Sequence, residues 1–366
     1  MQKEKSSIVA VHLLNDFSGS PLVFMQALQA LQASGHRIAI YTSGTRAGFL
    51  DQVEAERHRF PYRFFSNVLL RLTAFCFSQI FLFFQLLKYR RKDVVIYVNT
   101  LLPFGAALAG RLMGKKVIYH VHESYTRPLV LKKFLRGVAA ATADTVFYVS
   151  DYLLREEKLE GVKARVVYNA LPEEFVRKAN TSEYLPSNAG LFQVLMVCSL
   201  KEYKGVPQFV SLAARHPALA FELVLNATGD EIAAYFKETE LPANLKVFPV
   251  QKNLDPFYRR ASLVVNLTNP GRCIETFGMT LLEAMCYGVP VIAPPLGGPA
   301  ELVEEQKNGF AIDVRDEATL DFRLNYLAAN PDFMERLSDG ARQTAQRFGS
   351  GRFSESVVRT IEGIQD

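Results

Sequence analysis

Short apolar runs alternate with amphipathic stretches along the first half of the chain. These runs are continuous and rich in Val, Ile and Tyr, which is typical of strands buried on both faces of a sheet. They lie at Ile8–Leu14, Arg37–Thr42, Val94–Asn99, Lys116–His122 and Thr145–Ser150. Between the first two, Pro21–Ala33 carries apolar residues at helical spacing and stops before Gly35. Strand–helix alternation of this kind predicts a parallel, doubly wound α/β sheet.

The same pattern returns after a loop-like break at Asn169–Pro172. The second set of predicted strands is Val194–Cys198, Phe221–Asn226, Lys246–Val250, Leu263–Leu267 and Val291–Ala293. A chain of 366 residues is too long for one ordinary core and suits two domains of ~150–200 residues. We therefore expect two doubly wound domains, residues 1–168 and 169–350, with ligands in a cleft at the carboxyl ends of the strands.

The segment Val68–Leu87 does not follow the strand–helix pattern. It is almost entirely apolar, with Arg71, Ser78 and Gln85 as a thin polar stripe, and a basic run, residues 88–92, follows it. A helix that is apolar nearly all round must be buried by protein or by lipid. The first interpretation is a helix packed between the sheet and a neighbouring element. The alternative is a helix lying in the plane of a membrane, with the basic residues at the lipid headgroups. Arg71 disfavours a spanning helix.

Composition and charge limit the classes of partner. Hydrophobic residues make up 49% and charged residues 22% of the chain, as in a soluble globular protein. Residues 1–168 hold 23 Lys and Arg against 12 Asp and Glu, a net +11, whereas residues 169–366 hold 19 against 25, a net −6. Only the first half is therefore expected to meet an anionic surface. Its basic residues are dispersed and match no nucleic-acid motif, so we expect no nucleic-acid partner.

The four cysteines indicate the compartment. Cys76, Cys198, Cys273 and Cys286 are widely spaced, lack a C-x-x-C pair and sit in apolar runs. We expect each to be a free buried thiol. Without a disulfide pattern, a reducing, cytoplasmic compartment is favoured.

The candidate chemistry centres on the segment from Glu275 to Pro290. Residues 280–287 are predicted to form a helix that ends at Gly288, and residues 277–279 the loop that opens it. The free N–H groups at such a helix start form an anion site suited to a diphosphate. Glu275 lies before the helix and Glu283 one turn inside it, where carboxylates can accept hydrogen bonds from hydroxyls. Taken alone, this spacing is also compatible with a capped surface helix with incidental acids.

An ordered set of segments resembles the family-4 glycosyltransferases. The set comprises Phe17-Ser-Gly-Ser-Pro21, Leu200-Lys-Glu-Tyr-Lys-Gly205, Leu281–Ile292, Pro294–Val303 and Asn308–Asp313, and it covers most of the chain. The resemblance implies a retaining enzyme of GT-B architecture, with two Rossmann-like domains: an acceptor-side domain, residues 1–168, and a nucleotide-sugar domain, residues 169–350. It also implies that residues 351–366 form a helix that returns to the first domain.

The resemblance also assigns roles to residues. Glu275 would bind the hydroxyls of the donor sugar, and Glu283 those of the ribose. Lys204 would neutralise the diphosphate, with Gly205 letting the backbone approach the ligand closely. The backbone amides of Phe277, Gly278, Met279 and Thr280 would face the sugar and diphosphate. Gly19 and Ser20 of the first domain would lie near the diphosphate.

Two histidines end a predicted strand. Alternation places His120 and His122 on one face, at the edge where ligands bind. They could be structural histidines, and Glu123 beside them suggests a metal site, but no third distant ligand is evident. In the family, a histidine here meets the transferred sugar, and His122 is the better match. His122 and Glu275 are thus the expected catalytic residues, with the leaving phosphate helping to deprotonate the acceptor.

Departures from the family pattern leave other interpretations open. Ser199 stands where an arginine is usual, and Ser20 where a second glycine is usual. Lys201 or Arg272 could substitute for that arginine. A nucleotide-sugar epimerase and a catalytically idle sugar- or membrane-binding scaffold remain alternatives. Residues 16–20 lack the G-x-G-x-x-G loop of a dinucleotide oxidoreductase.

The expected partners follow from this interpretation. The donor is a nucleotide diphosphate sugar, and no cofactor or metal is expected, because the chain has no Asp-x-Asp motif. The acceptor is expected to be a glycan or lipid-linked glycan of polysaccharide or cell-envelope synthesis. The basic first half would then contact an anionic membrane peripherally at its cytoplasmic face.

Overall fold

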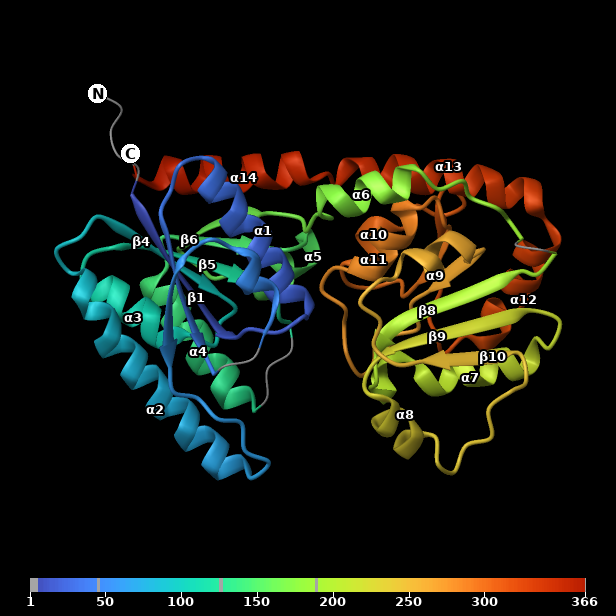
Figure 1. The fold of residues 1–366 in the computed structure, drawn as a ribbon, viewed down its shortest axis with the longest axis horizontal. Helices are drawn as coiled ribbons and strands as arrows, with labels where there is room; N and C mark the ends of the chain where they lie inside the picture. Colours follow the sequence, from blue (N-terminus) through green and yellow to red (C-terminus); the bar gives the residue numbers. More distant parts are fainter. Residues whose placement is uncertain (1–5, 45–46, 125–127, 188–189, 366) are drawn as a thin grey trace. The chain divides into compact units, whose positions relative to one another are not determined.

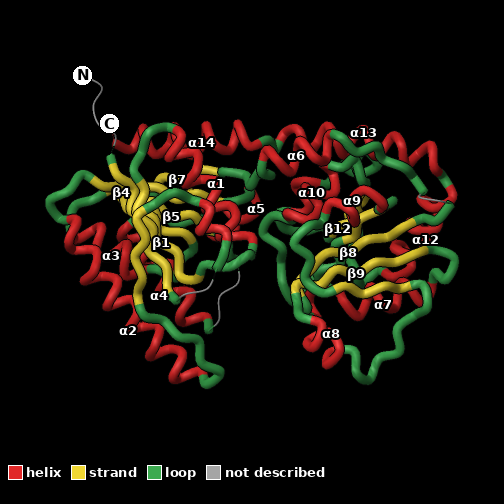
Figure 2. The backbone as a smooth tube through the Cα atoms, viewed as in Figure 1, coloured by secondary structure: helices red, strands yellow, loops and turns green. Residues whose placement is uncertain are grey.

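The computed structural model describes residues 6–44, 47–124, 128–187 and 190–365. The chain divides into two compact units, residues 1–170 with 350–366, and residues 171–349. The predicted boundaries were 168/169 and 350/351. Each unit is an α/β layer structure in which helices cover both faces of a parallel sheet (Figures 1 and 2).

The first unit has a seven-stranded parallel sheet in the order β3-β2-β1-β4-β5-β6-β7. The strands are β1 (Ser7–Leu14), β2 (Ile38–Ser43), β3 (Glu56–Phe60), β4 (Val94–Asn99), β5 (Lys116–Val121), β6 (Thr145–Tyr148) and β7 (Lys163–Val166). The helices are α1 (Gly19–Ala33), α2 (Val68–Leu86), α3 (Phe104–Leu112), α4 (Leu129–Thr142), α5 (Asp151–Glu157) and α14 (Ser350–Gln365), with short 3₁₀ turns η1 (Phe49–Gln52) and η2 (Leu87–Tyr89).

The C-terminal helix α14 belongs to the first unit. It packs against α1, and its Phe353, Val357 and Ile361 join the core under that helix. The opposite face of the sheet carries α2, α3 and α4, which contact one another in that order. Gly110 of α3 permits close packing there, since a Cβ atom would lie 2.7 Å from Val117 of β5.

The second unit has a six-stranded parallel sheet in the order β10-β9-β8-β11-β12-β13. The strands are β8 (Gln193–Ser199), β9 (Ala220–Asn226), β10 (Leu245–Phe248), β11 (Leu263–Val265), β12 (Val291–Ala293) and β13 (Gly309–Ala311). The helices are α6 (Glu173–Asn180), α7 (Val206–Arg215), α8 (Gly229–Tyr235), α9 (Asp255–Arg260), α10 (Met279–Cys286), α11 (Pro299–Leu302), α12 (Glu317–Ala329) and α13 (Pro331–Arg347), with the 3₁₀ turn η3 (Glu202–Lys204).

The sequence analysis did not predict three of the strands, and all three lie at the edges of their sheets. β3 reads Glu-Arg-His-Arg-Phe and β7 reads Lys-Ala-Arg-Val, so neither has the apolar run of a central strand. β13 has only three residues and begins with Gly309. These segments are strands because they pair with a neighbouring strand, which a local sequence pattern does not show. Polar side chains are usual in edge strands.

Helix α2 corrects two expectations. It is not buried between the sheet and a neighbouring element, because only Phe75, Ser78, Gln79, Leu82 and Leu86 are buried along it. Of the predicted polar stripe, Ser78 is buried and Arg71 and Gln85 are half-buried, whereas many of the apolar side chains face outward. All four cysteines are free, as expected, but only Cys286 is buried; Cys198 and Cys273 are half-buried, and Cys76 of α2 is exposed.

Candidate functional site

The loop before α10 is shaped by glycines. Gly278 has φ of 103°, a left-handed conformation that favours glycine, and serves as the N-cap of α10. Gly298 packs against the same loop so closely that a Cβ atom would lie 2.3 Å from the Phe277 Cα. Its N–H donates to the Glu275 carbonyl at 2.9 Å. The Gly297-Gly298 pair therefore holds the loop that carries Glu275.

The start of α10 offers backbone donors. No side chain caps this helix, and the amides of Gly278, Met279 and Thr280 donate to no other residue in the described part of the chain. The first N–H groups of a helix need partners from outside it and carry the positive end of the helix dipole. Met279 and Thr280 are half-buried, so the site can accept an anion from one side.

Lys204 and Glu275 form an ion pair, although 71 residues separate them. Lys204 lies in η3, and its side chain is 18% exposed against 24% for that of Glu275. Burial alone lowers the pKa of Lys204, but the carboxylate charge and hydrogen bond of Glu275 reverse this, and the net pKa is raised. Lys204 is therefore a fixed cation, which suits a diphosphate, and Glu275 is a paired carboxylate rather than a free base.

Glu283 is held by a tyrosine that the sequence analysis did not select. The Tyr258 hydroxyl donates to Glu283 Oε2 at 2.6 Å, and its ring stacks on Tyr287 at 5.5 Å between centroids. Burial raises the pKa of Glu283 to about 7, and the Tyr258 hydrogen bond only partly offsets this. Ligand hydroxyls that donate to this carboxyl group would favour its ionised form.

The glycine after Lys204 makes a close contact within the protein. Gly205 has φ of 83°, and a Cβ atom would lie 2.2 Å from the Leu267 carbonyl oxygen. It therefore allows η3 to pack on the segment after β11, a contact within the protein. Ser199 is half-buried at the end of β8. Arg272 pairs with Glu202 at 3.1 Å, and Lys201 is exposed.

In the first unit, Gly19 and Ser20 open helix α1. Gly19 is exposed, and a Cβ atom there would meet no atom within 4 Å. The space around Gly19 is therefore open, and no neighbouring atom would clash with a side chain at this position. The preceding turn is fixed by Asp16, whose Oδ1 accepts from the Ser18 amide at 2.9 Å. Ser20 uses its carbonyl oxygen to accept from Asn99 Nδ2 at 3.1 Å.

Asn99 organises the histidine cluster at the carboxyl ends of β4 and β5. Because Asn99 Nδ2 donates to the Ser20 carbonyl, its Oδ1 faces His122, 2.8 Å from Nε2. His122 must therefore carry its proton on Nε2. Burial lowers the pKa of His122 well below its ordinary value, and His120 and His12 lower it further. A neutral ring protonated on Nε2 leaves Nδ1 as a hydrogen-bond acceptor for a hydroxyl.

The neighbours of His122 form a compact buried group. The rings of His120 and His122 lie 4.4 Å apart, as expected for one face of the strand, and burial lowers the pKa of His120 to about 3. Glu123 accepts from the Leu101 amide at 2.9 Å and the His122 amide at 3.0 Å. It thereby braces Thr100, a non-glycine residue with φ of 68°, where backbone strain is stored.

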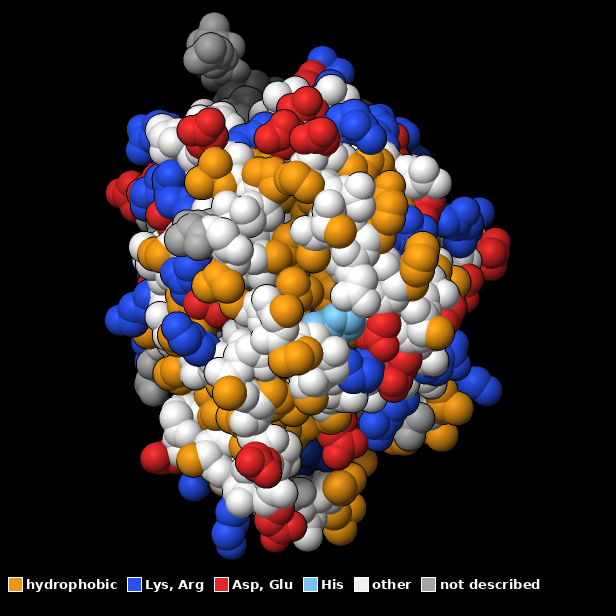
Figure 3. Space-filling view, turned by 90° about the vertical axis from the view of Figure 1, so that its right-hand side faces the viewer, with side chains coloured by type: hydrophobic (Ala, Val, Ile, Leu, Met, Phe, Trp, Pro, Cys, Tyr) orange, Lys and Arg blue, Asp and Glu red, His pale blue; other side chains and the backbone are white. Residues whose placement is uncertain are grey.

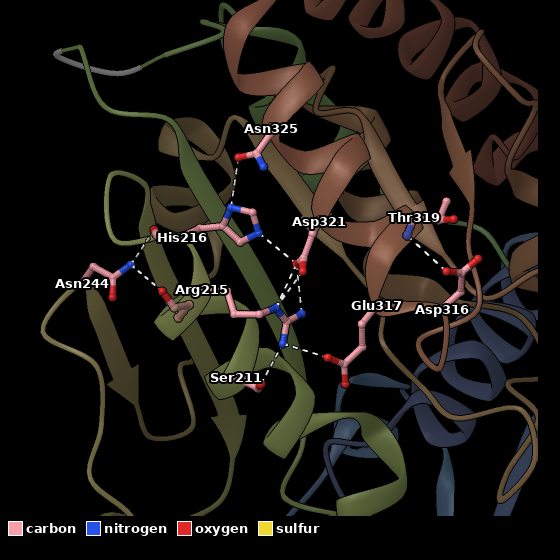
Figure 4. Close-up of polar contacts among 10 residues, drawn as sticks. Ser211, Arg215, His216, Asn244, Asp316, Glu317, Thr319, Asp321 and Asn325 are labelled. Atoms are coloured by element: carbon pink, nitrogen blue, oxygen red, sulfur yellow. Dashed lines mark hydrogen bonds and ion pairs between the residues drawn. The ribbon is translucent and has the colours of Figure 1, made fainter.

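A second polar cluster joins α7 to α12 (Figure 4). Asp321 accepts from Arg215 Nε at 2.8 Å and from His216 Nε2 at 2.9 Å. Asn244 Nδ2 lies within hydrogen-bond distance of the carbonyl oxygens of Ala213, His216 and Leu219, in and after the last turn of α7. Burial raises the pKa of Asp321, but the hydrogen bonds from Arg215 and His216 outweigh it, and the net pKa is lowered. These groups satisfy one another, so we interpret the cluster as structural.

The two units match two family descriptions in turn. Residues 17–175 match "Glycosyltransferase Family 4", and residues 178–344 match "Glycosyl transferases group 1". The chain is a family-4 glycosyltransferase. Together the matches take in both the α1 loop of the first unit and the Lys204–Glu283 region of the second. The recognition of the family from its ordered motifs is thereby confirmed.

Solved structures confirm the GT-B fold of this glycosyltransferase. The Anabaena protein HepE in complex with UDP superimposes with a TM-score of 0.79 at 18% identity, covering 98% of this chain and 100% of that one. The lipopolysaccharide outer core galactosyltransferase WaaB gives a TM-score of 0.73 at 18% identity, with 98% and 99% covered. At this level of identity the likeness shows the fold alone.

Curated relatives match over shorter stretches. A sucrose synthase from Acidithiobacillus caldus is 38% identical over 89 residues, 23% of this chain but only 11% of that protein. A D-inositol 3-phosphate glycosyltransferase from Salinispora arenicola is 31% identical over 166 residues, 42% of this chain and 35% of that protein. An uncharacterised glycosyltransferase from Haemophilus influenzae is 23% identical over 292 residues, with 76% and 78% covered.

Proposed function

We propose that this glycosyltransferase transfers a hexose-type sugar from a nucleotide diphosphate donor to a glycan or lipid-linked glycan, with retention of anomeric configuration. Three features of the second unit support the donor assignment. They are the open amides at the start of α10, the half-buried Lys204–Glu275 pair, and Glu283 with its hydrogen bond from Tyr258. A cation and helix amides suit a diphosphate, and carboxylates suit hydroxyls. HepE was solved with UDP and with UDP-glucose, so these are the first ligands to test.

We assign each candidate residue a role in that donor complex. Lys204 and the amides of Gly278, Met279 and Thr280 bind the diphosphate, and Phe277 contributes its backbone to the sugar. Glu275 binds sugar hydroxyls, and Glu283 binds the ribose. Ser199 occupies the place of the family arginine without its charge.

The first unit's Gly19, Ser20 and His122 are assigned to diphosphate and sugar by the family resemblance. The Nδ1 lone pair of His122 supports the assignment of that residue, because it can accept from a sugar hydroxyl.

The chemistry rests on charge stabilisation. His122 is neutral and Glu275 is paired with Lys204, so neither is a strong free base. The leaving phosphate would help to deprotonate the acceptor hydroxyl while Lys204 and the α10 amides stabilise its developing charge. The new glycosidic bond forms on the same face as the leaving phosphate. No cofactor or metal is needed, and activity should persist in EDTA; a requirement for added divalent cation would contradict this step.

Donor binding is tested by the melting temperature of the protein with UDP, GDP, ADP and dTDP and their sugar conjugates. A ligand at a hundred times its Kd should stabilise the native state by ~2.7 kcal/mol. We expect one nucleotide family to raise the melting temperature, and Glu283→Ala and Lys204→Met to abolish the rise. The matched controls Glu240→Gln and Lys252→Met, both exposed in the second unit, should keep it. If no nucleotide shifts the folded protein, the idle-scaffold alternative replaces this proposal.

Turnover separates transfer from isomerisation. Incubation of the identified donor without acceptor should leave the sugar unchanged apart from slow hydrolysis. Formation of an isomeric nucleotide sugar would support the epimerase alternative instead. The NMR coupling constant of the anomeric proton in a transfer product then decides between retention and inversion.

A further inference from the structure

Helix α2 presents an unusually apolar outer face. Phe77, Ile80, Phe81 and Phe84 repeat at helical spacing and are 41–64% exposed. Val68, Leu69, Leu70 and Leu72 extend the exposed apolar surface to the start of the helix. The helix is long and apolar enough to cross a membrane, yet only 22% of its most apolar window is buried in the protein. A continuous apolar surface of this kind marks an interaction site.

The surface continues onto the two neighbouring helices. Phe104 of α3 contacts Phe75 of α2 and Phe134 of α4, with ring centroids 5.8 and 5.1 Å apart. Leu129 and Val130, at the start of α4, are 69% and 78% exposed. The three helices therefore form one layer on the outside of the first sheet (Figure 1), and we call its exposed apolar residues the α2–α4 face.

The charges along α2 are of one sign, whereas Lys132 and Arg136 of α4 pair with Glu157. Residues 57–92 contain no Asp or Glu but eight Arg and Lys, and α2, α3 and α4 contain no acidic residue. Within the described ranges, Arg59, Arg63, Arg71 and the basic run after α2 form no ion pair with a carboxylate. The face drawn in Figure 3, by contrast, intersperses acidic with basic side chains. An apolar face bordered by unpaired cations matches an anionic lipid surface, and it would repel a second copy of itself.

Tight packing against α3 keeps α2 part of the fold. A Cβ atom at Gly105 would lie 2.2 Å from the Gln79 carbonyl oxygen, so the two helix backbones are in contact. The Gly105 amide also donates to Gln79 Oε1 at 3.1 Å, and both residues are buried. Withdrawal of α2 to span a bilayer would break this contact and expose the buried side chains of α2, such as Leu82 and Leu86. The helix can meet lipid only with its outer face.

A hollow beside α2 combines cations with apolar walls. Its volume is about 530 Å³, and its lining includes Arg59 of β3 and Arg63 after that strand, together with Tyr62, Ala74 and Phe77. Guanidinium groups are suited to phosphate, and the aromatic walls to an acyl or isoprenoid chain. The hollow therefore adds to the α2–α4 face a mainly apolar recess that has two arginines in its lining.

We propose that the first unit docks on an anionic bilayer through the α2–α4 face, with α2 lying in the membrane plane and Arg59 and Arg63 receiving lipid phosphate at the hollow. The docking stands apart from the donor site and needs no glycosyl transfer to be observed. It also explains how a lipid-linked acceptor would be met at the membrane surface, a consequence that does rest on the proposed function.

The absence of tryptophan from the chain provides a direct test. Single variants Leu70→Trp, Phe77→Trp and Phe84→Trp place one fluorophore along α2, and Phe322→Trp, 66% exposed on α12, is the matched control. With vesicles of phosphatidylglycerol and phosphatidylcholine, the three α2 variants should shift to blue emission and be quenched by brominated lipids at similar shallow depth. The control should not shift. A much deeper signal from the Phe77→Trp variant than from the other two α2 variants would indicate a spanning helix and overturn the proposal.

Binding measurements complete the test. Two multiple variants should each weaken flotation with anionic vesicles at least tenfold: the triple variant Phe77→Gln/Ile80→Gln/Phe84→Gln and the double variant Arg59→Gln/Arg63→Gln. The control Phe322→Gln should not weaken it. High salt should weaken wild-type binding, and neutral vesicles should bind poorly. Equal binding to neutral vesicles, or a dimer that the triple variant dissociates without any vesicle binding, would refute the proposal. Nucleotide-induced stabilisation of each variant shows that it is folded and keeps failure of docking distinct from failure of the donor site.

Discussion

Binding of a nucleotide sugar should expel a proton from Glu283. The raised pKa of this carboxyl, about 7, means that about half of the free protein carries the proton at pH 7, about 90% at pH 6 and about 10% at pH 8. Two ribose hydroxyls that donate to the carboxylate would return the pKa towards its ordinary value. Binding at pH 7 should therefore release about 0.5 proton, and the Kd should be about tenfold weaker at pH 6 than at pH 8.

Calorimetry in buffers of different ionisation enthalpy measures the released proton. A nucleotide diphosphate sugar is the right ligand, because its diphosphate lacks the terminal ionisation near pH 6 that would release or take up protons itself. Tyr258→Phe removes the hydrogen bond that lowers the Glu283 pKa, so it should move the pH dependence upward. Glu283→Gln should bind weakly and without proton release. Tight binding with no proton release and an unchanged Kd from pH 6 to 8 would refute the role of Glu283.

The same carboxyl should also affect stability. Because its pKa is higher in the folded than in the unfolded state, the contribution to stability is full below the ordinary pKa and is lost as the pH rises through about 7. Without ligand, Glu283→Gln should therefore gain stability relative to the wild type between pH 5 and pH 8. This gain separates the ionisation of Glu283 from its role in binding.

Two further predictions concern polar networks. Asn99→Asp replaces the amide that fixes the His122 tautomer, so the pKa of His122 should rise. The kcat/KM at pH 7 should fall at least tenfold, with little change in nucleotide affinity. Histidine ¹⁵N chemical shifts report the tautomer and the charge of the ring, and unchanged shifts would contradict the assignment. Asp321→Asn should lower the free energy of unfolding by about 1–3 kcal/mol at pH 7, because it leaves Arg215 and His216 with a weaker acceptor. Since the Asp321 pKa is lowered on folding, the difference should shrink as the pH falls through that pKa. A urea unfolding series from pH 3 to 7 measures it, and a pH-independent difference would argue against an ionic role.

Local sequence patterns were enough to predict the central strands and the start of the donor motif. Strands such as Val94–Asn99 are covered on both faces, so burial demands an unbroken apolar run that is visible locally. Gly278 and the helix after it are likewise local, since a left-handed N-cap and an amphipathic stretch depend on neighbouring residues. The same holds for the order of motifs from which the family was recognised.

The pairing of polar groups, in contrast, follows from the tertiary structure. The Lys204–Glu275 pair, the Tyr258–Glu283 hydrogen bond and the Asn99–His122 contact join residues far apart in the chain. No local pattern encodes such pairs, because the sheet order brings together the ends of non-consecutive strands. Gly205 shows the same limit: its close neighbour is the Leu267 carbonyl, and a ligand seemed equally suitable from sequence.

Helix α2 shows most clearly what the sequence determines and what the tertiary structure determines. Its composition shows that protein or lipid must cover it, and the sequence alone favours neither face. In the folded unit, Ser78 and Gln79 are buried and Gln79 accepts from the Gly105 amide of α3, while several phenylalanines stay exposed. The hydrophobicity of the helix determines how much apolar surface must be removed from water. Packing against the rest of the unit determines which side of the helix stays exposed.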